Sequence, residues 1–311
     1  MMSIIKTAKT KNKSKQKKKF NKEVLKDYFL VGGFLIIPLV LLALFSYFPI
    51  IKLFEISFTD WNGLSAVANN VGLANYKEVF GSGEVFKPFV NNMAYVITAL
   101  VQQIFGLLFA ILLDSNLKKR NFFRTSVFLP YIINGVAIAF IFNYMFDFNN
   151  NPINEFLRYI GLGDHAVRFL GPNYFSNFSL AFISFWKYVG FTMVIYLSAL
   201  QTVPRDVYEA ARVDGANFWQ TVRYITIPGV KKMVSISIIL SMNGALQAYF
   251  EPFLITKGGP NDRTQTFVTK TLEVAFNFQK FGKAAVMSIT LLAIILIVVG
   301  ITQYMSRKKE D

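Results

Sequence analysis

The sequence contains no cysteine and only one histidine, and charged residues make up 16% of its 311 residues. Without cysteine, the chain can form no disulfide, thiol nucleophile or cysteine-ligated zinc site. His165 has no second histidine or HExxH pattern near it, so neither a metal site nor an acid–base role is expected there. The chain also lacks the glycine-rich phosphate-binding loop that ends in Gly-Lys-Ser or Gly-Lys-Thr. If the protein uses ATP, another chain must bind it.

Hydrophobic residues are abundant instead, at 53% of the chain, and aromatic residues make up 16%. A soluble domain carries about 25% charged residues, so this composition indicates a membrane protein. The formal net charge is +15, but ten of the 33 lysines and arginines precede Tyr28. Such a run is typical of a solvated tail that anionic lipid attracts by about 1 kcal/mol per basic residue. Nucleic acid is not an expected partner.

Six segments are apolar enough, and long enough, to cross a bilayer as helices of about 20 residues. The only charged residues inside them are Lys187 and Glu251. The first segment has too long an apolar core for a signal peptide and no small-residue cleavage site, so we interpret it as an anchor. The predicted spans are 29–51, 92–113, 126–146, 177–200, 233–255 and 284–305.

The distribution of lysine and arginine predicts the orientation of these spans. With the N-terminus inside, the cytoplasmic segments hold 22 basic residues and the outer loops hold 10. Cytoplasmic loops are the ones enriched in lysine and arginine, so both termini are expected to face the cytoplasm. The predicted organisation is a basic cytoplasmic tail (1–27), a membrane region (28–306) and a short cytoplasmic tail (307–311).

Between the fourth and fifth spans lies an amphipathic segment, 204–228, which we predict to be a helix–turn–helix on the cytoplasmic surface. Pro204 suits the first turn of a helix, and Gly215 suits the left-handed turn that ends it. Asn217 is a suitable cap for a second helix, which Pro228 is expected to separate from the fifth span. From the physics alone, the segment could dock on a partner protein or rest on lipid.

The spacing within this segment resembles the EAA loop of the permease subunits of ABC importers. The pattern is EAA, three residues, Gly, nine residues, Ile, one residue, an aliphatic residue and Pro, and this chain matches it at Glu209, Ala210, Ala211, Gly215, Ile225, Ile227 and Pro228. Asp214 before the glycine also fits the family. "VGLANYKEVF", "NFFRTSVFLP" and "ITKGGPNDRTQTFVTKTLEVAF" are similar to the carbohydrate-uptake branch, which includes the maltose and raffinose-type permeases. The resemblance runs from about residue 28 to about residue 305.

The resemblance implies an all-α membrane protein with six transmembrane helices and the type I ABC importer permease fold. It implies a bacterial cell-membrane location, pairing with a second, homologous permease that we expect to be a distinct chain, and an extracellular sugar-binding protein. It also implies that the segment 204–228 enters a groove on an ATPase dimer, which would bind ATP and Mg²⁺, while this chain holds no cofactor. The expected ATPase-coupling residues are Glu209, Ala210, Ala211, Asp214, Gly215, Ile225 and Pro228.

The resemblance further places the substrate pathway near mid-membrane, on spans four and five. Sugars require groups that bind hydroxyls and aromatic faces that pack on their C–H sides, and these two spans carry both. An ionisable residue within a span is a functional candidate by default, and Lys187 could pair with Glu251. The pathway candidates are Ser184, Lys187, Tyr188, Phe191, Ser241, Asn243, Gly244, Gln247, Tyr249 and Glu251.

Two alternatives to a sugar permease are considered. A permease for glycerol phosphate or another non-sugar solute would share the coupling loop, but a phosphate should require more cationic groups than Lys187 alone. A membrane-embedded enzyme would need paired carboxylates, a histidine cluster or an activated nucleophile at membrane depth. None of the six spans offers such a set.

Overall fold

The structure is a computed structural model that describes residues 26–83, 86–115, 118–149, 151–171 and 175–307. Within these ranges the chain is helical, with one isolated β-bridge between Thr59 and Asn70 and no strand. The all-α class predicted from the apolar runs is therefore confirmed. Residues 1–25 and 308–311, which belong to the predicted terminal tails, lie outside the described residues.

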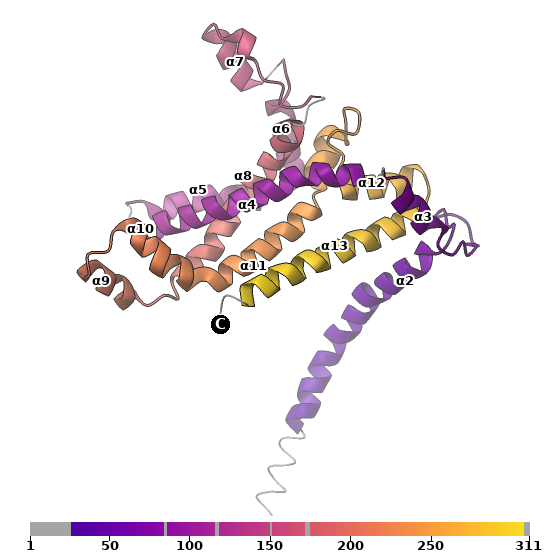
Figure 1. Cartoon of the computed structure of the whole chain (residues 1–311), viewed down its shortest axis with the longest axis horizontal. Coiled ribbons are helices and arrows are strands. Elements are labelled where there is room, and N and C mark those ends of the chain that lie inside the picture. Colours follow the sequence, from indigo (N-terminus) through magenta and orange to yellow (C-terminus); the bar gives the residue numbers. More distant parts are fainter. Residues whose placement is uncertain (1–25, 84–85, 116–117, 150, 172–174, 308–311) are drawn as a thin grey trace, which may run out of the picture. The chain divides into compact units, whose positions relative to one another are not determined.

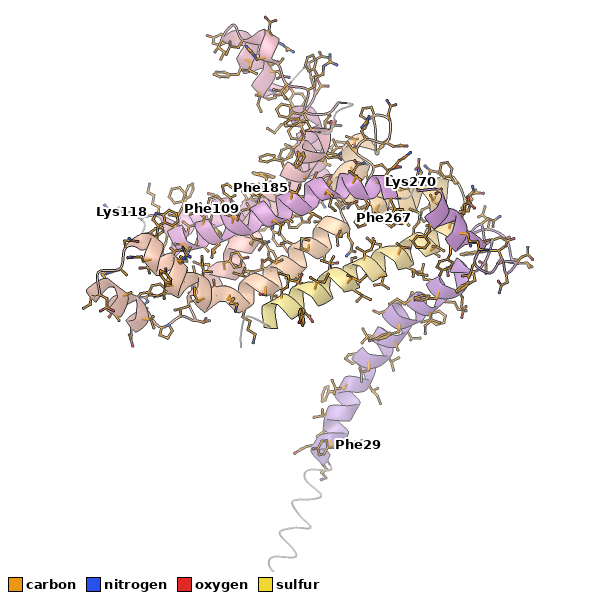
Figure 2. All side chains as sticks on the ribbon, viewed as in Figure 1. Phe29, Phe109, Lys118, Phe185, Phe267 and Lys270 are labelled. Atoms are coloured by element: carbon orange, nitrogen blue, oxygen red, sulfur yellow. The ribbon has the colours of Figure 1, made fainter. Side chains whose placement is uncertain are left out.

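The chain divides into two compact units, Met1–Ile56 and Ser57–Asp311. In the first unit the described residues form one apolar helix, which runs from Lys26 to Ser57 and is long enough to cross a bilayer. Phe29, labelled in Figure 2, lies near its start. The helix contains a π-helical turn, η1 (Ala43–Tyr47), followed by α2 (Phe48–Ser57).

The second unit contains all the other helices, most of which are labelled in Figure 1. If the bent pair α5–α6 is counted as one span, six segments of the described chain are long and apolar enough to cross a membrane, as the sequence predicts. In chain order its elements are α3 (Ala74–Gly81), α4 (Lys87–Asp114), α5 (Arg120–Ile132), α6 (Gly135–Met145), α7 (Pro152–Tyr159), η3 (Gly163–His165), α8 (Phe175–Leu200), α9 (Arg205–Val213), α10 (Phe218–Thr221), η4 (Val222–Thr226), α11 (Ile227–Leu246), η5 (Pro252–Thr256), α12 (Phe267–Leu272), η6 (Glu273–Asn277) and α13 (Phe281–Arg307).

The core of the second unit is built around α4, α8 and α11, which pack against one another. Phe185 of α8, labelled in Figure 2, meets Phe105 of α4 edge to face, with ring centroids 5.5 Å apart. Gly190 lets α5 approach α8 closely, because a Cβ at this position would lie 2.1 Å from the Val127 carbonyl oxygen. Many large apolar side chains stay exposed on the outer faces of these helices, which is typical of helices that face lipid.

The third predicted span, 126–146, is not one straight helix. It is divided between α5 and α6, whose axes differ by 96° at the break. Pro130 removes a hydrogen-bond donor near the end of α5. The Asn134 side chain then accepts from the Val136 N–H at 2.8 Å and caps α6. A local cap thus competes with helix continuation at the point where proline has weakened the helix.

The fifth span is shifted along the chain from the predicted range 233–255. A continuous helix runs from Phe218 to Leu246, so the prediction that Pro228 separates the cytoplasmic segment from this span is wrong. The π-helical turn η4 ends two residues before Pro228 and accommodates its ring, which would clash with the preceding turn of a regular α-helix. At its other end the helix stops at Leu246, before residues that were expected to continue it.

The two ends of the helical bundle are distinct. Figure 1 shows α9 and α10 at one end of α11, with the C-terminal end of α13 on the same side, whereas α3 and α12 lie at the other. Figure 2 shows the same separation for two lysines of the predicted inner and outer connections, since Lys118 and Lys270 lie near opposite ends of α4. The predicted cytoplasmic loops therefore gather at one end of the bundle.

Candidate functional site

A cavity of about 500 Å³ opens between α4, α5, α8 and the end of α11. All ten residues predicted for the substrate pathway line it. The lining residues of α4 and α5, and the aromatic rings beside the predicted positions, were not predicted from the sequence. The lining residues outside the predicted set are Tyr95, Thr98, Ala99, Gln102, Tyr131, Phe185, Leu240, Ala245, Ala248 and Phe250.

A break in the fifth span forms one side of the cavity. After Leu246 the chain leaves the helix, so Gln247 and Tyr249 lie on an irregular turn, and Glu251 lies in the next helical segment, directly before η5. The last carbonyls of a helix lack internal donors, and when buried they need other partners. The Asn92 Nδ2 donates to the carbonyl oxygens of Ala245 at 3.0 Å and Leu246 at 3.2 Å.

Asn92 also holds the start of α12. Its Oδ1 accepts from the backbone N–H of Phe267 at 2.9 Å, at the start of α12. Thr266 caps the same helix through a capping box with Thr269, and its hydroxyl donates to the Ala248 carbonyl oxygen at 2.6 Å. One buried asparagine of α4 therefore ties together the end of α11 and the start of α12.

The two ionisable groups of the spans face this cavity but do not form an ion pair. The Ser184 hydroxyl donates to Glu251 Oε1 at 2.6 Å. Lys187 Nζ lies 5.4 Å from the ring centroid of Tyr188 and 5.8 Å from that of Phe250. No carboxylate of the described residues lies within 4.0 Å of it, so the predicted Lys187–Glu251 pair is absent. The ammonium is stabilised by two aromatic faces instead.

Other predicted pathway residues are already bonded to neighbours. Ser241 Oγ accepts from Gln103 Nε2 at 2.6 Å, and the Asn243 Oδ1 accepts from Gln247 Nε2 at 2.5 Å. Phe191 stacks on Tyr131, with ring centroids 4.7 Å apart, and Tyr249 stacks on Phe253 at 4.8 Å. The cavity therefore combines oriented amides and hydroxyls with aromatic faces.

The segment 204–228 forms the predicted helix–turn–helix. Helix α9 ends at Val213, and Gly215, two residues later, has a φ of +76°. The Gly215 N–H donates to the Arg212 carbonyl oxygen at 3.2 Å, and the Ala216 N–H donates to that of Ala211 at 2.9 Å. This pair of bonds is the Schellman motif, whose left-handed residue is usually glycine because other residues are strained there.

The second arm starts at Asn217, as predicted. The Asn217 side chain accepts from the Gln220 N–H at 2.9 Å, and the Gln220 side chain accepts from the Asn217 N–H at 2.7 Å. These reciprocal bonds form a capping box. The Tyr208 hydroxyl, 3.4 Å from Thr226 Oγ1, links the two arms.

The expected ATPase-coupling residues lie on this element, mostly on its surface. Glu209, Ala210, Asp214, Gly215 and Pro228 are exposed, whereas Ala211 and Ile225 are half-buried. None of the residues of α9 is buried. Because α10, η4 and α11 form one helix, the segment predicted to couple to an ATPase is continuous with a wall of the cavity. The role of the expected ATPase-coupling residues in binding an ATPase stays a prediction.

Comparison with known proteins identifies the family. The model of the binding-protein-dependent transport system inner membrane component matches residues 102–311. The probable ABC transporter permease protein YurN of Bacillus subtilis is 32% identical over 264 residues, which cover 84% of this chain and 90% of YurN. The multiple sugar-binding transport system permease protein MsmF of Streptococcus mutans is 30% identical over 89% of this chain and 95% of MsmF.

A solved structure shows the same fold. A chain of a bacterial ABC transporter involved in the import of the acidic polysaccharide alginate matches with a TM-score of 0.77 and 24% identity, covering 92% of this chain and 98% of that chain. The likeness agrees with the all-helical architecture and with the apolar spans described above. This chain therefore belongs to the family of binding-protein-dependent transport system inner membrane components.

Proposed function

We propose that this permease carries a sugar or an oligosaccharide, delivered by an extracellular binding protein, through the cavity between α4, α8 and α11. The cavity is the observation that carries the proposal. Its hydroxyl and amide groups suit a ligand with many hydroxyls, and its aromatic rings suit the C–H faces of a sugar ring. The sugar-transport role named for the Streptococcus mutans relative supports the same substrate class.

The charges of the cavity favour a sugar over a phosphorylated solute. Lys187 is the only lysine or arginine among the lining residues, and Glu251 supplies a carboxylate in the same cavity. A phosphate ligand is usually bound by several cationic or bidentate donors, and a neighbouring carboxylate would repel it. These charges make a permease for glycerol phosphate a less favoured function than a sugar permease, and it is kept as the second candidate. The family consists of transport subunits rather than enzymes.

The cytoplasmic helix–turn–helix is proposed to couple transport to ATP hydrolysis on separate subunits. Glu209 would bond to the ATPase, Ala210 and Ala211 would permit close packing, and Gly215 would set the turn. The helix from Phe218 to Leu246 has no break, so a push on α10 would move the residues about 35 Å away at the cavity as one body. ATP and Mg²⁺ would be bound by the ATPase dimer and not by this chain.

The proposed assembly contains a second, homologous permease chain, which we expect to be distinct, in addition to the ATPase dimer and the binding protein. The membrane is the bacterial cell membrane, with both termini in the cytoplasm. This orientation is supported by the excess of 22 basic residues over 10 on the predicted inner side. Figure 1 is consistent with it, since the end of α13 lies at the same end of the bundle as α9 and α10.

Reconstitution of the complete transporter tests the sugar assignment. The four components are incorporated into liposomes with ATP inside, and uptake of radiolabelled maltotriose, raffinose and glycerol 3-phosphate is compared. We expect saturable, ATP-dependent uptake of at least one saccharide and none of glycerol 3-phosphate. Uptake of glycerol 3-phosphate without uptake of any saccharide would select the second candidate.

A further inference from the structure

Helix α4 forms one side of the cavity, although no substrate-pathway residue was predicted on this helix from the sequence. Tyr95, Thr98, Ala99 and Gln102 follow one another at helical spacing and all line the cavity. The first and the last are seven positions apart, which places them roughly 10 Å apart along the helix. This distance is longer than a single sugar ring.

The Gln102 side chain is oriented so that its oxygen is left for a ligand. Its Nε2 donates to Thr192 Oγ1 at 2.8 Å and to the Tyr188 carbonyl oxygen at 3.4 Å. Both amide protons are therefore used between α4 and α8. No described residue donates to Oε1, and the side chain lines the cavity. The amide thus presents an acceptor whose position is set by two bonds on the opposite side.

Tyr95 presents the complementary group. Its side chain is 3% exposed, and its hydroxyl has no hydrogen-bond partner among the described residues. Buried hydroxyls are nearly always paired, so an unpaired one beside a cavity calls for an explanation. A permease changes shape between transport states, and a ligand that enters the cavity as its wall moves can supply the missing acceptor.

We propose that α4 is a third wall of the saccharide site, in which Gln102 Oε1 accepts from one sugar hydroxyl and the Tyr95 hydroxyl donates to another sugar oxygen. The proposal rests on the proposed function and adds the size of the ligand. Because the two residues lie roughly 10 Å apart along the axis of α4, they would contact different rings of a saccharide with at least two units. A monosaccharide reaches only one of them.

Tyr95→Phe tests the donor without disturbing the protein, because the hydroxyl makes no described bond that the substitution could break. Tyr196→Phe is the matched control. Tyr196 is fully buried in α8, does not line the cavity, and donates to Gln103 Oε1. For the acceptor, Gln102→Met is paired with Gln103→Met, the same substitution at the next residue of α4, which is buried and does not line the cavity.

The variants are measured in the reconstituted transporter with maltotriose or raffinose, whichever the wild type takes up, and with monodeoxy derivatives of that sugar. We expect Tyr95→Phe and Gln102→Met to raise the KM for uptake about two- to tenfold, the value of one lost hydrogen bond. Each variant should also transport one monodeoxy derivative as well as it transports the parent sugar, because the hydroxyl missing from that derivative no longer has its partner in the variant. The two controls should lower the thermal midpoint and leave the KM within twofold of the wild type.

The outcomes separate the two proposals. If the wild type takes up neither trisaccharide, the sugar assignment fails and the role of α4 fails with it. If the wild type takes up the sugar but Tyr95→Phe and Gln102→Met keep its KM and its full discrimination against every deoxy derivative, the third wall is rejected and the sugar assignment stands. An increase in KM in the controls equal to that in the paired variants would likewise reject it.

Discussion

Replacing Gly215 tests whether the geometry of the coupling turn matters for transport. Gly215 has a φ of +76°, and a Cβ built there would meet no described atom within 4 Å. An alanine would therefore cause no clash, and its cost would be the left-handed backbone alone, about 1–2 kcal/mol. Asparagine tolerates this conformation much better, so Gly215→Asn is the matched control.

The size of the expected effect follows from this cost. Helix α9 has no buried residue, so packing does little to hold the turn in place once its backbone is strained. A cost of about 1–2 kcal/mol corresponds to a factor of roughly 5 to 30 in an equilibrium constant. We expect Gly215→Ala to weaken binding of the ATPase by up to this factor, and Gly215→Asn to weaken it by much less.

The assay measures ATPase binding to the detergent-solubilised permease pair, together with sugar-stimulated ATP hydrolysis in liposomes. Membrane abundance should be the same for both variants, because the turn is exposed and remote from the core. Equal ATPase affinity for Gly215→Ala, Gly215→Asn and the wild type would refute the reasoning that the left-handed turn at Gly215 orients the loop for binding to the ATPase.

Three further predictions address the cavity and its supports. Lys187→Met should raise the KM for the sugar at least about tenfold, since a charged hydrogen bond contributes about 1.5–3 kcal/mol, while the complex still assembles; unchanged uptake kinetics would remove Lys187 from the site. Asn92→Leu should lower stability by about 1–3 kcal/mol for each buried backbone group that loses its partner, seen as a lower thermal midpoint, and an unchanged midpoint would contradict the pinning role. Partial burial raises the pKa of Glu273, but hydrogen bonds from Lys270 and Gln265 outweigh it and hold that pKa below its ordinary value. The ionised Glu273 carboxylate therefore stabilises the fold at neutral pH, and this stabilisation is lost as the pH falls through the lowered pKa. Glu273→Gln should thus destabilise the protein at pH 7 and match the stability of the wild type in acid. A stability difference that does not change with pH would count against the role of the Glu273–Lys270 pair.

The sequence predicted the all-α class and the number of apolar spans, but not where the helices break. Apolar runs identify spans because a bilayer demands them. The break before Asn134 had local signals, namely Pro130 and an asparagine cap, yet the uncharged run concealed them. Pro228 gave the opposite error. Proline is a strong helix-ending signal, but here a π-helical turn accommodates Pro228 within a continuous helix. Neither Pro228 nor the residues around it form a sequence pattern that predicts this turn.

The candidate site was predictable where polar residues interrupt apolar spans. Lys187, Ser241 and Glu251 stand out in this way, and the structure gathers them around one cavity. Tyr95 and Gln102 were missed because their direction depends on how α4 is rotated against α8. That rotation is set by long-range packing, including the contact between Gly106 and Thr192, where a Cβ would lie 2.5 Å from the threonine methyl. No local pattern in the sequence encodes it.

The most direct test of the account places a single cysteine on the coupling loop. The chain has no native cysteine, so Ala210→Cys carries a photocrosslinker at one known, exposed position. Leu64→Cys, exposed in the predicted outer loop, is the control. In the complete transporter we expect position 210 to form an adduct with the ATPase, in a yield that changes when ATP is added, and position 64 to form none. Absence of an ATPase adduct at position 210 in an active transporter would contradict the claim that this loop binds the ATPase.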